Sequence, residues 1–121
     1  MKKSKIFIIS CGVYPFDVMV AFCATHEEVL KKIRKTGYKL NQEEINALKR
    51  DSAGRTTMLM GGQVIIQLAN YPKPGSPVLA HEVFHTVFAI MDRIGIPLSN
   101  DSDEAYAYLV QFLTKELGAH I

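Results

Sequence analysis

The sequence predicts one small α+β domain with its elements in the order ββααββαα. Two pairs of short β-branched or aromatic runs are joined by turn residues, and capping motifs precede apolar residues at helical spacing. The 121 residues are enough for one hydrophobic core and too few for two domains, and the chain has no repeat or linker. We therefore expect residues 1–121 to form a single domain with helices packed on a mainly antiparallel sheet.

A β-hairpin is expected at the amino terminus. Residues 5–10 form a β-branched and aromatic run, residues 12–15 supply the turn, and residues 17–24 form a second apolar run. This pairing does not bring Cys11 opposite Cys23, so we expect no disulfide and two buried, reduced thiols.

Two helices should follow the first hairpin. Thr25 and Glu28 have the spacing of a capping box, and Gly37 supplies the end of that helix. Asn41 and Glu44 have the same spacing at the start of a second, shorter helix.

A second hairpin and two longer helices complete the predicted domain. Residues 56–60 and 63–68 are β-like and are separated by two glycines, a strong hairpin signal. Ser76 and Pro77 pair an N-cap with a proline at the first helical position, and Gly95 ends that helix. The polar run at 99–103 opens a last helix that reaches about residue 117, with Asp101 as the expected cap.

Composition and charge narrow the classes of partner. The formal net charge of +2 is too small to argue for nucleic acid or a membrane as a partner. The apolar run at residues 6–9 is shorter than a signal peptide requires, and no stretch approaches the length of a transmembrane helix. We therefore expect a cytoplasmic protein that binds neither nucleic acid nor membranes.

The segment from His81 to His85 carries the clearest chemical signature, HExxH. Residues four apart on a helix lie one above the other, so both imidazoles can reach one metal ion. Glu82 lies about 100° around the helix from His81, where it can polarise a metal-bound water. The pattern predicts a Zn²⁺ site; the alternative is two hydrogen-bonded surface histidines with an exposed glutamate.

A catalytic zinc usually takes three protein ligands and keeps a fourth position for water. The start of the last helix offers acidic candidates, and Glu104, nineteen residues after His85, is the preferred third ligand, with Asp103 second. Alternatively, Glu104 completes a capping box with Asp101. Tyr108 is one turn after Glu104, so its hydroxyl could stabilise an oxyanion, although an ordinary half-buried tyrosine fits the pattern too.

Residues 80–85 and 103–109 resemble the corresponding segments of the minimal gluzincins. These small HExxH metallopeptidase-like domains include the ImmA/IrrE-type proteins of bacteria and prophages. The whole plan is also similar to small phage and prophage proteins, and the motif-bearing likeness covers about residues 63–117. It implies a zincin-like fold in which two histidines and a glutamate bind zinc and a strand, here 63–68, lines the substrate cleft. We expect no helix-turn-helix extension of the kind that many family members carry.

The expected function is therefore zinc-dependent hydrolysis, most simply of a peptide bond in a peptide or protein substrate. Zinc would acidify its bound water, and Glu82 would act as the general base. A free edge at residues 63–68 could align an extended peptide by β-addition. The alternative is a non-catalytic zinc-binding phage or prophage protein that engages a host or assembly partner. The oligomeric state is left open by the sequence.

Overall fold

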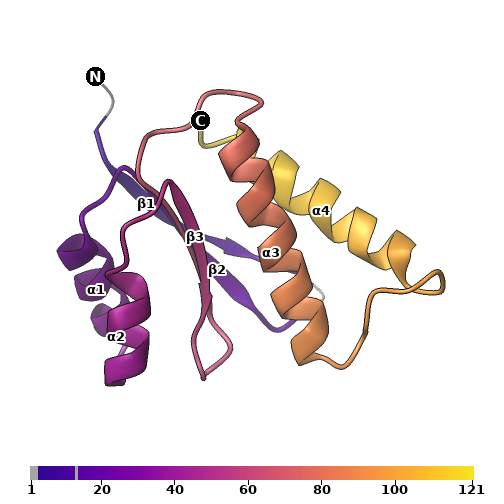
Figure 1. Cartoon of the computed structure of the whole chain (residues 1–121), viewed down its shortest axis with the longest axis horizontal. Coiled ribbons are helices and arrows are strands. Elements are labelled where there is room, and N and C mark those ends of the chain that lie inside the picture. The colour runs from indigo at the N-terminus through magenta and orange to yellow at the C-terminus, as the bar shows by residue number, and fades with distance from the viewer. Residues whose placement is uncertain (1–2, 13) are drawn as a thin grey trace.

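The computed structural model describes residues 3–12 and 14–121 as a small α+β domain with four helices and a four-stranded mixed sheet (Figure 1). Val13, within the expected first turn, lies outside the described residues. The elements follow one another as β1 (Lys5–Ser10), β2 (Asp17–Phe22), α1 (His26–Lys35), α2 (Gln42–Leu48), β3 (Gly54–Met58), β4 (Val64–Leu68), α3 (Pro77–Arg93) and α4 (Asp103–Gly118).

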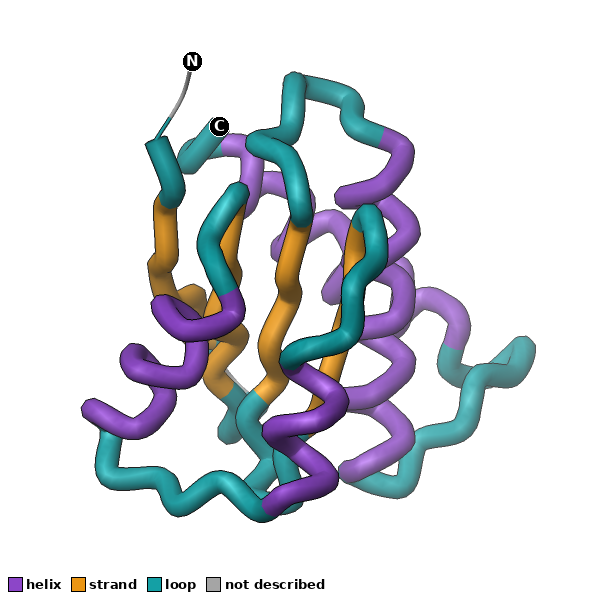
Figure 2. Tube along the Cα trace, turned by 60° about the vertical axis from the view of Figure 1, so that its left-hand side comes forward, coloured by secondary structure: helices purple, strands orange, loops and turns teal. Residues whose placement is uncertain are grey.

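The sheet has the strand order β1-β2-β4-β3, and Figure 2 shows the four strands side by side. The β1–β2 and β3–β4 pairs are antiparallel, as the two hairpin predictions required, whereas β2 and β4 pair in parallel. The parallel pair arises because α1 and α2 form a crossover between the hairpins. β4 is therefore an interior strand, and the prediction of a free edge at residues 63–68 is wrong. In the described part of the chain the free edges belong to β1 and β3.

α1 and α2 cover one face of the sheet, and α3 and α4 cover the other (Figure 1). Successive side chains of a strand point to opposite faces, so each interior strand contributes to two cores. Met19 and Ile65 pack against α1 and α2, whereas Val20 and Ile66 belong to the core that α3 and α4 cover. Each core contains fully buried side chains, such as Leu48 in the first and Leu113 in the second.

The cap of α3 follows the sequence prediction, and the cap of α4 does not. Ser76 Oγ accepts a hydrogen bond from the backbone N–H of Leu79 at 3.2 Å, and Pro77 occupies the first turn of α3. The N-cap of α4 is Ser102, not Asp101, and it makes no side-chain cap hydrogen bond. Its hydroxyl instead donates to the carbonyl of Pro97 at 2.6 Å, within the preceding loop.

The cysteines are free, as predicted, but their burial differs. Cys11 is buried, while Cys23 is exposed because β2 ends at Phe22 and a φ of 56° at Cys23 turns the chain away. The expectation that both thiols are buried is therefore wrong for Cys23. None of the helices among the described residues has the length and apolar character needed to cross a membrane.

Candidate metal centre

His81 and His85 lie one turn apart on the exposed side of α3, and their imidazoles converge. Their Nε2 atoms are 3.0 Å apart, and the ring planes meet at 71°. Two nitrogen ligands at about 2.0–2.1 Å from a tetrahedral zinc would be about 3.3 Å apart. The pair therefore fits two positions of a zinc site, and the same separation also suits an N–H···N hydrogen bond between two neutral rings.

Glu82, between the two histidines in sequence, points toward β3 instead of solvent and is only 5% exposed. Its Oε1 accepts a hydrogen bond from the hydroxyl of Thr56 at 2.8 Å. Its Oε2 accepts no hydrogen bond from a described residue, yet it is not among the buried polar atoms that lack a partner. Oε2 therefore keeps contact with solvent and is the oxygen free to take up a proton.

β3 leaves room for that carboxylate through Gly54. A Cβ added at Gly54 would lie 2.9 Å from Glu82 Oε2 and 2.7 Å from Cγ1 of Val78. Gly54 and Thr56 are two residues apart on the strand, so they face α3 together. One makes space for the carboxylate, and the other holds it with a hydrogen bond.

The backbone of Glu82 is tied down as well. Thr86, which is fully buried one turn later, donates its hydroxyl to the Glu82 carbonyl at 2.9 Å. The Thr56 hydroxyl lies 3.2 Å from the same carbonyl oxygen. Hydrogen bonds therefore hold both the backbone carbonyl and the side-chain carboxylate of Glu82 between α3 and β3.

Gly54 and Thr56 were not among the site residues that the sequence predicts. They precede Glu82 by more than 25 positions, and only the alternation along a correctly placed β3 could have put them on one face. The predicted strand at 56–60 began two residues late and left Gly54 outside it.

Glu104 and Asp103 are exposed in the first turn of α4, and neither joins the histidine pair. In the part of the chain that the structure describes, no three His, Cys, Asp or Glu side chains are grouped so that they could hold a metal ion. Figure 1 shows the reason: α4 approaches α3 with its later turns, and its start is the end that lies away from α3. The buried ring of Tyr106 anchors that start, because its hydroxyl donates to the carbonyl of Ile96 at 2.6 Å.

The exposed surface beside the histidines is aromatic. Phe84 and Phe88 are 48% and 45% exposed, and their ring centroids are 6.4 Å apart. The Phe84 ring also lies 6.3 Å from that of His85. Tyr108, the candidate oxyanion donor, is 66% exposed on α4. The described arrangement therefore contains two converging nitrogen donors, a held carboxylate and an apolar rim.

The chain matches no protein-family model, no curated protein and no solved structure.

Proposed function

We propose that this chain is a zinc-dependent hydrolase that cleaves peptide bonds, with a zincin-like fold of the minimal gluzincin type. The observation that carries the proposal is the convergence of His81 and His85 Nε2 at 3.0 Å beside a buried glutamate whose Oε2 is free. The histidines would hold Zn²⁺ as neutral imidazoles. Glu104 is the proposed third ligand, with Asp103 as the alternative, and either requires the start of α4 to move toward α3.

Zinc bound there would supply a Lewis acid and a water of lowered pKa. Glu82 acts as the general base: Thr56 fixes Oε1, and Oε2 takes the proton of the attacking water and later delivers it to the leaving amine. Tyr108 is the proposed oxyanion donor. Its exposure of 66% means that bound substrate would have to cover it before its hydroxyl could act in a dry environment.

The edge strand β3 is the proposed docking site for an extended peptide. The Ala53 carbonyl and the Leu59 N–H both bond toward the β4 side. Because an antiparallel ladder alternates, the even positions Gly54, Thr56 and Met58 direct their N–H and C=O groups away from the sheet. A peptide added to this edge would run past Glu82, which Thr56 holds from the same strand.

The resemblance to phage and prophage proteins supports a cytoplasmic setting in a bacterial host. The proposed partner is a peptide or protein substrate, without nucleic acid or membrane. The likeness at residues 80–85 and 103–109 and the modest net charge support this setting and this class of partner.

The decisive experiment compares metal content with cleavage. The purified protein should bind one zinc per chain and cleave members of a mixed peptide library, and a chelator should stop the cleavage. Glu82→Gln should keep the zinc and lose cleavage by at least about 100-fold, since general-base catalysis contributes about 10²–10⁴. His81→Ala should lose the zinc. Full activity of the Glu82→Gln protein would exclude the proposed mechanism.

A non-catalytic zinc-binding protein is the second candidate. It is favoured by one observation: in the described arrangement, Glu104 and Asp103 do not join the exposed histidine pair. Such a protein would use zinc to engage a host or assembly partner. Stoichiometric zinc that is lost in His81→Ala, together with no cleavage by the wild-type protein, would select this function.

A further inference from the structure

We propose that a pocket on the face of the sheet opposite α3 binds a small oxyanion, a carboxylate or phosphate that carries its own hydrogen-bond donor. The pocket has a volume of about 340 Å³ and lies where β2 and β4 end, between the start of α1 and the segment that joins α2 to β3. That volume is within the range of small-molecule sites. The proposal is independent of the histidine pair, because the pocket faces the other helical layer.

Two arginines give the pocket its positive charge. Arg50 and Arg55 both line it, and neither guanidinium forms a hydrogen bond or ion pair with any residue that the structure describes. Burial lowers the pKa of the Arg55 guanidinium, the nearby charge of Arg50 lowers it further, and the charge of Glu82 raises it. An anion bound beside both guanidinium groups would offset the repulsion that lowers the pKa of Arg55.

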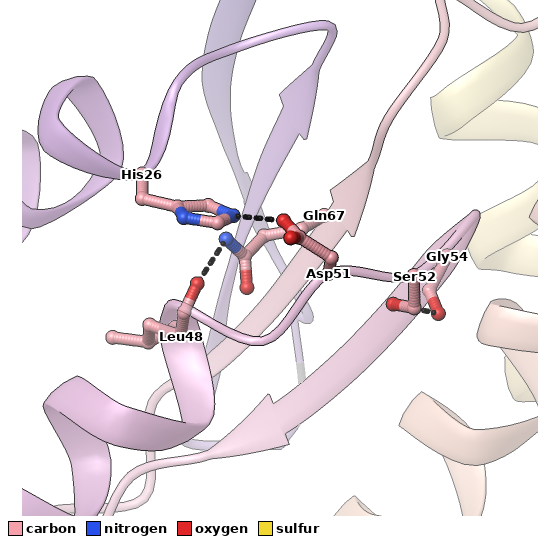
Figure 3. A network of polar contacts seen from close by, with 6 residues as sticks. All are labelled: His26, Leu48, Asp51, Ser52, Gly54 and Gln67. Atoms are coloured by element: carbon pink, nitrogen blue, oxygen red, sulfur yellow. Dashed lines mark hydrogen bonds and ion pairs between the residues drawn. The ribbon is translucent and has the colours of Figure 1, made fainter.

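Two buried polar atoms beside these charges have no hydrogen-bond partner among the described residues. They are Nε of Arg55 and Oε1 of Gln67, which come from residues directly opposite each other on β3 and β4. Buried donors and acceptors are nearly always hydrogen-bonded, so such a pair indicates that something else completes the site. The Gln67 amide nitrogen donates to the Leu48 carbonyl at 3.0 Å, which leaves Oε1 as an acceptor (Figure 3).

These atoms define the chemistry of the ligand. The guanidinium N–H groups require an acceptor with negative charge, and the planar fork of arginine suits a carboxylate or a phosphate. Gln67 Oε1 requires a donor close to that charge. An amino-acid derivative with a free carboxylate and an amide N–H meets both needs, and so does a protonated phosphate.

Asp51 is the one acidic residue among the described residues of the lining, and its negative charge disfavours the binding of an anion. Its side chain is 99% exposed, so solvent screens its charge, and its carboxylate lies 3.7 Å from Nε2 of His26 (Figure 3). Removing this charge should strengthen anion binding, whereas removing either arginine should weaken it. The test therefore includes one variant that should bind the anion more tightly and two that should bind it less tightly.

Inorganic phosphate and N-acetylglycine are the two probes, each titrated into ¹⁵N-labelled full-length protein at constant ionic strength. The Nε–Hε signal of Arg55 should shift and saturate with at least one probe, and the tighter one assigns the ligand as phosphate or carboxylate. Arg55→Gln and Arg50→Gln should weaken binding about tenfold or more, since hydrogen bonds to charged groups are lost. Asp51→Asn should tighten it.

Arg34→Gln is the matched control, because it removes the same charge from an exposed position of α1 outside the pocket. The proposal is overturned if neither probe saturates, or if Arg34→Gln weakens binding as much as Arg55→Gln. It is also overturned if Asp51→Asn fails to tighten binding in a folded protein. Zinc-free and zinc-loaded protein should bind the probes equally, which separates this site from the proposed hydrolase.

Discussion

Glu82 illustrates how one side chain can be buried and still available for chemistry. Its carboxylate is held on one oxygen by Thr56 and has solvent contact on the other. A buried charge without partners is costly, and the hydroxyl offsets part of that cost. The space for the carboxylate exists only because Gly54 has no side chain, so Gly54 is a positioning residue for Glu82.

Gly54→Ala should therefore displace the carboxylate. The new Cβ would meet Glu82 Oε2 at 2.9 Å and Val78 Cγ1 at 2.7 Å, both closer than Cβ contacts normally come. We expect a loss of about 1–3 kcal/mol in the free energy of unfolding, typical of overpacking, and reduced peptide cleavage with zinc content unchanged. Urea unfolding and metal analysis measure the two effects. Gly118→Ala is the control, because a Cβ there meets nothing within 4 Å; equal behaviour of the two variants would refute the role given to Gly54.

At the scale of elements, Glu44 connects α2 to the turn between β3 and β4. Its carboxylate accepts hydrogen bonds from the Tyr38 hydroxyl at 2.7 Å and from the backbone N–H groups of Asn41 and Met60, each at 2.9 Å. Burial alone would raise the pKa of Glu44, but these three hydrogen bonds outweigh it and hold the pKa below its usual value. The capping glutamate read from the sequence is thus also a tertiary contact.

The lowered pKa fixes the pH dependence of this contact. The carboxylate stabilises the fold fully above the unfolded pKa of about 4.3 and loses its contribution as the pH falls through the lower folded value. Glu44→Gln should cost about 1–3 kcal/mol at pH 7, and the difference from wild type should shrink below about pH 4.3. Chemical unfolding of both proteins between pH 3 and 7 measures this difference in the free energy of unfolding. Glu43 is an exposed neighbour in the same turn, so Glu43→Gln should lose little free energy of unfolding. A loss in Glu44→Gln that does not change with pH would contradict the role given to the Glu44 carboxylate.

The free edge of β3 also belongs to the scale of elements. Met58 directs its N–H away from the sheet, so Met58→Pro removes an outward donor without breaking the β3–β4 ladder. Met58→Ala loses the same side-chain packing and keeps the donor. If peptides add to this edge, KM for cleavage should rise several-fold more in Met58→Pro than in Met58→Ala, with equal zinc content. Equal KM values in the two variants would place the peptide elsewhere.

At the scale of the whole molecule, local signals were readable from the sequence and distant pairings were not. Neighbouring residues determine the two antiparallel hairpin pairings, the capping boxes at Thr25 and Asn41 and the start of α3, and the structure has all of these. The parallel pairing of Val18 with Val64 joins strands far apart in the chain, and no local pattern specifies it. The start of α4 is also held by packing, because the ring of Tyr106 is buried in the core that α3 and α4 cover. The convergence of the two histidines could be predicted because it depends only on the spacing along one helix. The position of Glu104 could not, because it depends on how α4 packs.

The sheet joins two separate cores, so the molecule should unfold as one unit. Cys11, 4% exposed in the core beneath α3 and α4, can report on this, because burial raises the pKa of its thiol to about 11 and keeps it unreactive while folded. In a Cys23→Ser background, Cys11 should react with a thiol reagent only through opening. Leu48→Ala acts in the other core, on the opposite face, and should cost about 2–5 kcal/mol.

If both cores open together, Leu48→Ala should accelerate Cys11 labelling by the factor that matches its loss of unfolding free energy, about tenfold for each 1.4 kcal/mol. The labelling rate and urea unfolding of the same two proteins provide the comparison. Lys49→Ala, an exposed change beside Leu48, should leave the rate unchanged. If Leu48→Ala does not change the labelling rate of Cys11, the β1–β2 end opens independently of the core that contains Leu48. The two cores would then not unfold as one unit.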